Sequence, residues 1–250
     1  FNKIKELESM RINFWYPKNE LIWNTRINVN KGTKIIQLFT KRNTLALTML
    51  YNKIENIKDK NIKDIFKFIF TGFIAKSSKL NFVNVGGYKS KGRGWAIRGY
   101  WIPPEHMEQN VWNDFEGQYS LVLKGKENSN QLISAFEETH LSDNLKNKAN
   151  ILIKTFNALE LEKILPANSV DYIFTDPPYG DAIPYLELNY MWSSWLKFTP
   201  NFEDEIIISD SPARDKTAEL YDRMIKAAFN QIFRVLKAGK YMTVTFHNTD

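Results

Sequence analysis

The feature that most constrains the fold is a mostly apolar segment that runs directly into two prolines. Residues 170–175 read VDYIFT, and the chain continues with Asp176, Pro177, Pro178 and Tyr179. An almost continuous apolar run is typical of a strand buried on both faces of a parallel sheet. Proline fixes φ and has no N–H to donate, so a buried strand must end before it. The sequence therefore predicts a buried strand that carries a rigid polar turn at its carboxyl end.

Predicted strands and helices alternate around this segment. In chain order they are a strand and loop within 150–159, a short helix ended by Pro166, the strand at 170–175, a helix over 184–196 with Pro184 in its first turn, a long amphipathic helix over 217–237 stopped by Gly239, and a strand over 241–246. This order indicates an open α/β sheet, in which ligands bind beyond the carboxyl ends of the strands.

The first half of the chain predicts helices over residues 41–56, capped by Thr40, and over 61–75. The phenylalanines of the second helix are expected in the core. Further on, residues 119–125 suit a strand and residues 130–140 a helix.

The polar turn has the chemistry of an acceptor site. Its two prolines remove backbone donors and leave carbonyl oxygens free to accept hydrogen bonds from a ligand. Asp176 adds a carboxylate acceptor and Tyr179 adds a flat aromatic face. Together they suit a planar group that bears an amine.

The charge of the chain is divided unevenly along its length. Residues 1–100 hold 20 Lys and Arg against 6 Asp and Glu, whereas the remaining 150 residues hold 14 against 22. A basic half joined to an acidic half indicates a part that binds a polyanion such as nucleic acid. The alternative is a lysine-rich composition from an AT-rich genome, which would spread over both halves.

A glycine-rich segment at residues 81–104 interleaves cations with aromatic residues. The residues expected to contact nucleic acid there are Lys89, Lys91, Arg93, Trp95 and Arg98. Lys and Arg neutralise phosphates, and aromatic faces stack on unpaired bases. The alternative is a solvated surface loop.

Several classes of protein are not indicated. The chain has no cysteine, and His106, His140 and His247 lack the spacing of a metal site, so no metal is expected. The sequence contains no apolar run of about 18 residues, so no membrane span is expected. No signal peptide is recognisable at the start, and we expect a cytoplasmic protein.

The turn and its flanks resemble a known family. Asp176-Pro177-Pro178-Tyr179, the preceding LPANSVD and the later IFRVLKAGKYMTVTF together resemble the amino-methylating DNA methyltransferases, chiefly the adenine-N6 enzymes. In the segment IFRVLKAGKYMTVTF, Ala238 stands where the family has proline and Lys240 where it has glycine. The resemblance implies a Rossmann-like class I methyltransferase fold. Residues 149–250 would be part of the catalytic domain, and residues 1–148 a basic, mixed α+β region for target recognition.

The resemblance also implies an activity. S-adenosyl-L-methionine would be the cofactor and double-stranded DNA the substrate, with a flipped adenine methylated at N6. The Asp176 carboxylate and the Pro177 carbonyl would accept from the adenine amine, Pro178 would shape the turn, and Tyr179 would stack on the base. Asp176 and Asn157 would also contact the cofactor; for Asn157 the alternative is a loop cap. The family's glycine-rich cofactor loop is absent, and we expect it upstream of Phe1.

Other interpretations stay open. The same chemistry could act on cytosine N4, on RNA or on a protein, and a restriction nuclease could be a partner in a prokaryotic cell. A different class is a DNA-binding remnant of a methylase fold without activity.

Overall fold

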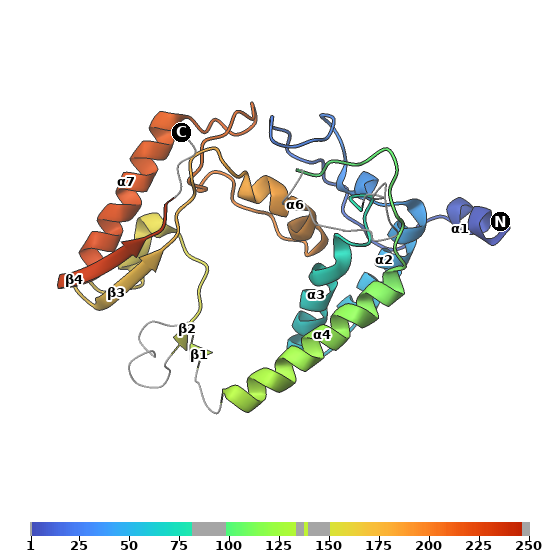
Figure 1. Cartoon of the computed structure of the whole chain (residues 1–250), viewed down its shortest axis with the longest axis horizontal. Coiled ribbons are helices and arrows are strands. Elements are labelled where there is room, and N and C mark those ends of the chain that lie inside the picture. The colour runs from blue at the N-terminus through green and yellow to red at the C-terminus, as the bar shows by residue number, and fades with distance from the viewer. Residues whose placement is uncertain (1, 82–98, 134–137, 140–150, 247–250) are drawn as a thin grey trace, which may run out of the picture. The chain divides into compact units, whose positions relative to one another are not determined.

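The structure is a computed structural model that describes residues 2–81, 99–133, 138–139 and 151–246. It is a mixed α/β protein whose described residues form two small two-stranded parallel sheets (Figure 1). The chain forms two compact units. Unit 1 comprises Phe1–Asn128 and Tyr185–Pro200, and unit 2 comprises Ser129–Pro184 and Asn201–Asp250.

Unit 1 is helical. Its elements are α1 (Asn2–Ser9), the 3-10 helix η1 (Ile35–Leu38), α2 (Lys41–Glu55), α3 (Lys60–Ile74), most of α4 (Val111–Leu132) and α6 (Tyr185–Trp195). Two of these helices begin with a side-chain cap, since Thr40 accepts from the N–H of Asn43 and Asp59 from that of Ile62. The predicted helices over 41–56 and 61–75, and the Thr40 cap, are therefore confirmed.

An aromatic cluster fills the core of unit 1. The fully buried Trp195 of α6 lies 5.4 Å from Phe70, 5.9 Å from Tyr51 and 6.0 Å from Phe39, ring centre to ring centre. Rings at these separations pack edge-on or tilted, which adds to the free energy gained from burying them. Phe70 and Phe73 of α3 are buried as expected, but the expectation is wrong for Phe68, which is 64% exposed. Ile62 and Ile65 of the same helix are also exposed.

A buried tyrosine joins the loop before residue 101 to α6 within unit 1. The Tyr100 hydroxyl donates to the carbonyl of Leu188 and accepts from the N–H of Met191 at 3.2 Å. Burial holds the pKa of the Tyr100 phenol well above its usual range. The hydroxyl is therefore a structural hydrogen-bonding group.

We expect Tyr100→Phe to lower the free energy of unfolding of unit 1 by about 1–2 kcal/mol, because a buried hydrogen-bonding group is lost. Urea unfolding followed by tryptophan fluorescence measures this change. Tyr119→Phe is the matched control, because Tyr119 is 40% exposed and none of the hydrogen bonds between described residues uses its hydroxyl. Equal midpoints for the two variants would contradict the role of Tyr100.

The prediction of a strand over residues 119–125 is wrong, because these residues belong to α4, the long green helix beside α3 in Figure 1. Phe115 and Tyr119, four residues apart, both stack on Phe66 of α3 at 6.2 and 6.1 Å. This i, i+4 pairing places both rings on one helical face. Of the predicted helix over 130–140, residues 130–132 lie in α4 and residues 138–139 form a strand, while residues 134–137 and 140 lie outside the described residues.

Unit 2 holds the parallel pairs. Its elements are β1 (Glu138–Thr139), β2 (Ile151–Leu152), the 3-10 helix η3 (Ala158–Lys163), β3 (Val170–Thr175), α7 (Ala218–Val235) and β4 (Leu236–Val244). β1 pairs with β2, and β3 pairs with β4, both in parallel. The predicted order of elements from residue 170 to residue 246 is thus confirmed.

The junction of α7 and β4 differs from the prediction. The helix ends at Val235, and Gly239 lies within β4 with φ of +74°. On β4 the partner of Val170 is Leu236, whereas the partner of Tyr172 is Tyr241, so the register shifts across the glycine. A glycine adopts this left-handed backbone without strain. It therefore accommodates the register shift inside β4 and does not end the helix.

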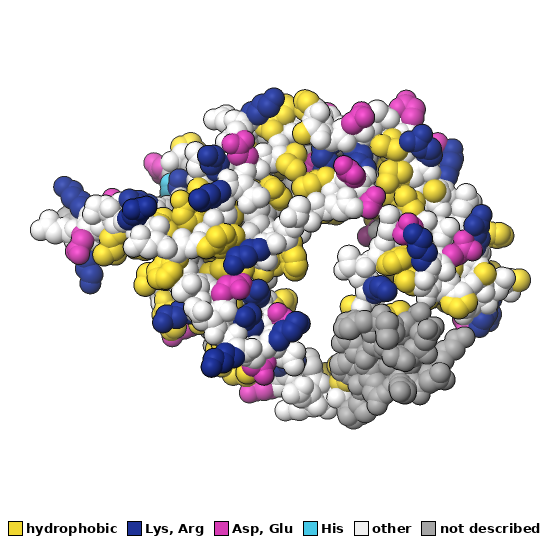
Figure 2. All heavy atoms as spheres, turned by 180° about the vertical axis from the view of Figure 1, so that it is seen from behind, with side chains coloured by type: hydrophobic (Ala, Val, Ile, Leu, Met, Phe, Trp, Pro, Cys, Tyr) yellow, Lys and Arg dark blue, Asp and Glu magenta, His cyan; other side chains and the backbone are white. Residues whose placement is uncertain are grey.

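The prediction that β3 is buried on both faces is also wrong for the described residues. Tyr172 and Phe174 are 56% and 64% exposed, and Tyr241, paired with Tyr172, is 78% exposed. Paired residues of parallel strands share a face, so these rings form one uncovered face. Exposed hydrophobic side chains are visible among the charged ones in Figure 2.

The compact units follow a different division from the functional one predicted at residue 148. Tyr185–Pro200 belongs to unit 1, because Met191 and Trp195 fill its core. The functional division stays a prediction. Among the described residues, no helix has both the length and the apolar character needed to span a membrane.

Candidate functional site

The Asp-Pro-Pro-Tyr turn follows β3 directly and lies at the carboxyl edge of the β3–β4 pair. Beyond the strands, the N–H of Thr245 donates to the carbonyl of Thr175 at 3.0 Å. The Thr245 hydroxyl then donates to Oδ1 of Asp176 at 2.6 Å, and the Tyr179 hydroxyl donates to the same oxygen. One carboxylate oxygen of Asp176 is therefore anchored to both strand ends.

The second carboxylate oxygen is available. Among the described residues, no hydrogen bond reaches Oδ2 of Asp176, and the residue is exposed. A carboxylate that is fixed through one oxygen holds the other in a defined direction. The arrangement can accept a hydrogen bond from a ligand without reorganisation.

The two proline carbonyls differ in their partners. The Tyr221 hydroxyl of α7 donates to the Pro178 carbonyl at 2.7 Å, so this oxygen is engaged within the protein. Within the described part of the chain, the Pro177 carbonyl has no hydrogen-bond donor. The Pro177 carbonyl is thus open in both lone-pair directions, whereas the Pro178 carbonyl already accepts one hydrogen bond. The result is a pair of adjacent acceptors, Oδ2 of Asp176 and O of Pro177.

The aromatic part of the site includes a residue that the sequence interpretation missed. The rings of Tyr179 and Phe246 lie 5.6 Å apart at 83°, an edge-on contact. Phe246 follows β4 as Tyr179 follows β3. Parallel strands end at the same edge of a sheet. The position of Phe246 at the end of the predicted strand YMTVTF was therefore a signal in the sequence that Phe246 lies near the turn.

A structured loop supports the turn from the chain that follows α6. Gly180, at φ of +58°, accepts through its carbonyl from the N–H of Ile208 at 3.1 Å. In the same loop Arg214 forms a buried ion pair with Glu205, and its guanidinium lies 4.6 Å from the ring of Phe202. A buried pair of this kind holds the loop in one conformation because either charge alone would be costly. The sequence interpretation did not assign this loop a role.

The hydroxyl groups around Asp176 favour its charged form. The hydrogen bond from Thr245, followed by that from Tyr179, holds the pKa of the Asp176 carboxyl below its usual range. The residue is therefore an anion at neutral pH, and it acts as a hydrogen-bond acceptor and not as a strong base.

This environment leads to a pH prediction. Because the carboxyl pKa is lower in the folded chain than the ordinary value of about 3.9, its anionic form stabilises the fold above about pH 4. That contribution is lost as the pH falls through the folded pKa. We expect Thr245→Val to move the carboxyl pKa up towards the ordinary value. Carbon-13 NMR titration of the Asp176 carboxyl group measures it, and an unchanged midpoint would contradict the assigned hydrogen bond.

Asn157 acts as a helix cap. Its Oδ1 accepts from the N–H of Leu159 at 2.9 Å and begins η3. This is one of the two roles considered for it, and an amide oxygen keeps a second lone pair. The role of Asn157 towards the cofactor stays a prediction.

The residues predicted to contact nucleic acid, Lys89, Lys91, Arg93, Trp95 and Arg98, lie outside the described residues. Within the described part of the chain, no group of three or more His, Asp or Glu side chains is arranged to hold a metal ion.

Comparison with models of known families, with curated proteins and with solved structures gives no significant match. The function of the chain is therefore inferred from the geometry of the turn and from the chemistry of its residues.

Proposed function

We propose that this chain belongs to an S-adenosylmethionine-dependent methyltransferase that modifies the exocyclic N6 amine of adenine in double-stranded DNA. The observation that carries the proposal is the pair of open acceptors at the carboxyl edge of β3. Oδ2 of Asp176 and the Pro177 carbonyl lie on consecutive residues of a turn that the ends of β3 and β4 hold in place.

To hold a planar base by its exocyclic amine, a site needs two hydrogen-bond acceptors for the amine and an aromatic ring beside the base. In the proposed complex Oδ2 of Asp176 and the Pro177 carbonyl each accept one N–H bond of the amine. These bonds draw electron density towards the nitrogen and orient its lone pair, which conjugation with the ring otherwise holds back. Tyr179 packs against the base, and Pro178 and Tyr221 keep the turn rigid. Rate enhancement then comes from positioning and electrostatics.

The state of Asp176 limits what it does with protons. Its carboxyl pKa lies below the usual range, so it is ionised when the amine binds and accepts a hydrogen bond from it. S-adenosylmethionine supplies an electrophilic methyl group when bound.

The residues present fit part of this cofactor. The Asn157 amide oxygen has a lone pair beyond the bond from Leu159, which suits the cofactor's adenine amine, and the Asp176 carboxylate suits its positive charge. A Rossmann-like catalytic sheet, of which β3 and β4 would be two strands, is part of the proposal.

Nucleic acid is favoured over a protein acceptor by charge. The excess of Lys and Arg in residues 1–100 suits a polyanion, and a protein acceptor gives no reason for it. The proposal includes a prokaryotic cytoplasm as the compartment.

The class of acceptor is tested by incubating the protein, together with any residues that precede Phe1, with methyl-labelled S-adenosylmethionine and an equal mixture of duplex DNA, RNA and protein from methylase-deficient bacteria. The proposal predicts label in the DNA fraction. Label confined to RNA or protein would overturn the choice of substrate. No label in any fraction, together with no cofactor binding, would overturn the methyltransferase.

A further inference from the structure

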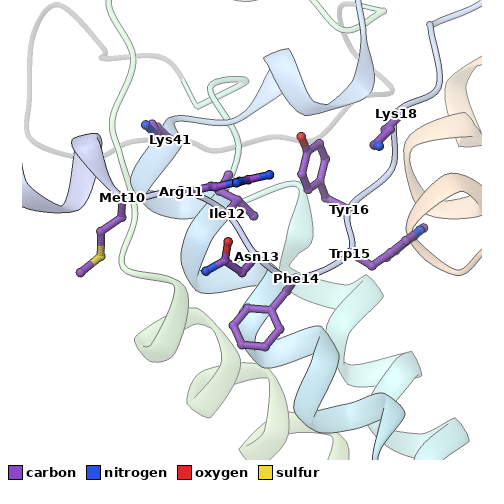
Figure 3. A pocket seen from close by; sticks show the side chains of 9 residues that line it. All are labelled: Met10, Arg11, Ile12, Asn13, Phe14, Trp15, Tyr16, Lys18 and Lys41. Atoms are coloured by element: carbon purple, nitrogen blue, oxygen red, sulfur yellow. The ribbon is translucent and has the colours of Figure 1, made fainter.

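A cleft lies in unit 1 where the chain runs extended from α1 towards η1. Its volume is about 590 Å³, within the range of natural ligand sites. The residues that line it are Met10, Arg11, Ile12, Asn13, Phe14, Trp15, Tyr16, Lys18 and Lys41 (Figure 3). All but Lys41 lie on one continuous segment.

The lining is cationic. It includes Arg11, Lys18 and Lys41 and no Asp or Glu. The nearby Glu8 and Glu108 both bind Arg42, the first at 3.2 Å. Within the described part of the chain, no carboxylate therefore forms an ion pair with the three cations of the cleft. A concave surface with three positive charges has a strong positive electrostatic potential, which attracts an anionic ligand.

Three of these side chains converge. Figure 3 shows the Arg11 guanidinium and the Lys18 amine pointing towards the Tyr16 side chain, with Phe14 and Trp15 directed to other sides of the segment. A guanidinium, an ammonium and a hydroxyl together match the oxygens of a phosphate group.

The surface continues into a second hollow of about 410 Å³. Ile12, Tyr16 and Lys41 line both hollows, and the second adds Lys79, again without an acidic residue. Cations spaced along a continuous surface suit a repeating polyanion better than a single phosphate.

The segment also carries two exposed aromatic side chains, of which Trp15 is held by ring contacts. Trp15 is 44% exposed, yet its ring lies 5.5 Å from Tyr51 and 6.2 Å from the buried Trp195. Phe14 is 38% exposed. Rigid aromatic groups beside cations are the combination found where proteins hold a nucleic-acid strand.

We propose that these two hollows form a track for the phosphate backbone of the DNA substrate. Arg11, Tyr16 and Lys18 hold one phosphate, Lys41 and Lys79 hold phosphates further along, and Trp15 or Phe14 contacts a sugar or an unpaired base. This inference rests on the proposed function for its choice of DNA. The cofactor does not suit the site, because its sulfonium charge would meet three cations.

The test uses the 250-residue chain and a fluorescently labelled duplex, with binding followed by anisotropy at several salt concentrations. The variant is Arg11→Gln, Lys18→Gln and Lys41→Gln together. The matched control is Lys53→Gln, Lys58→Gln and Lys124→Gln, which removes the same charge from exposed positions of unit 1 outside both hollows. Each lost phosphate contact lowers the slope of log affinity against log salt by about 0.9, so the cleft variant should lose about 2–3 and the control well under 1.

The outcomes separate this inference from the proposed function. A wild-type chain that binds and methylates DNA, with equal slopes in the cleft and control variants, would overturn the track alone. DNA binding that depends on the cleft would support the track whether or not methyl transfer is seen. Absence of methyl transfer by the protein that includes the residues upstream of Phe1 would overturn the proposed function. Absence of DNA binding by the wild-type chain would overturn the track.

The source of the phosphate is tested by competition. Free deoxyadenosine monophosphate is added at a concentration equal to that of the phosphates in the duplex. If it displaces the duplex, the hollow is a site for single nucleotides and the track is overturned. RNA binding tighter than duplex binding, with the same dependence on Arg11, Lys18 and Lys41, would also overturn the assignment to DNA.

Discussion

We expect Asp176→Ala to reduce methyl transfer to DNA by about 10²–10³-fold or more, as for removal of a preorganised group that stabilises a transition state. The change removes the acceptor Oδ2 and also the anchor that receives hydrogen bonds from Thr245 and Tyr179. The fold should survive, because Asp176 is exposed and lies beyond the last paired residue of β3. The rate is measured with labelled cofactor at saturating DNA, and the fold by circular dichroism.

Two further variants make this result specific. Asp222→Ala removes a carboxylate of α7 that pairs with Lys226 on the surface, and it should leave the rate within about twofold. Thr245→Val keeps the Asp176 carboxylate but loses one of its anchors, so its effect should lie between the other two. An Asp176→Ala rate equal to that of Asp222→Ala would remove Asp176 from the reaction.

The largest expected effect on stability comes from Gly99→Ala. Gly99 has φ of +48°, and an added Cβ would lie 2.2 Å from the backbone oxygen of Arg26. The neighbouring backbone cannot give way easily, because the N–H of Asn28 donates to the Gly99 carbonyl at 2.6 Å. Left-handed strain and overpacking together should lower the free energy of unfolding of unit 1 by about 3–5 kcal/mol. Urea unfolding monitored by tryptophan fluorescence measures the change.

Gly32 is the matched control for this effect. Its φ of +83° is equally unfavourable for alanine, but no atom lies within 4 Å of an added Cβ. Gly32→Ala should therefore cost only the backbone strain, about 1–2 kcal/mol. Equal destabilisation by the two variants would mean that the close approach to Arg26 does not matter.

Local signals predicted much of the fold. The cap at Thr40 and the 3.6-residue spacing of the apolar side chains predicted α2 and α3 within a few residues, and the Asp59 cap of α3 was a local signal left unused. The strand at β3 follows from its apolar run and from the prolines that end it. These features depend on neighbours in the sequence, so the sequence alone is sufficient to detect them.

Features that depend on distant contacts could not be predicted in this way. The segment YSLVL has the composition of a strand, yet its helix is stabilised by Phe115 and Tyr119 packing on Phe66 of another helix. The exposure of Tyr172 and Phe174 likewise depends on which elements cover the sheet, and an apolar run does not contain that information.

The site shows the same distinction. The sequence placed Asp176 and Pro177 correctly at the carboxyl end of a strand, because the motif and the strand are contiguous. The partners Thr245 and Tyr221 lie 69 and 43 residues away from Asp176 and Pro178 in the chain. Only the parallel pairing of β3 with β4 and the packing of α7 bring them to the turn.

The central claim is that the turn at Asp176 directs a methyl group to the N6 amine of adenine. Nucleoside mass analysis tests it most directly, on DNA from methylase-deficient bacteria incubated with labelled S-adenosylmethionine and either the wild-type chain or Asp176→Ala. The claim predicts labelled N6-methyladenine with the wild-type chain and none with the variant. Labelled N4-methylcytosine would contradict the choice of base, and equal N6-methyladenine from both proteins would contradict the role of Asp176.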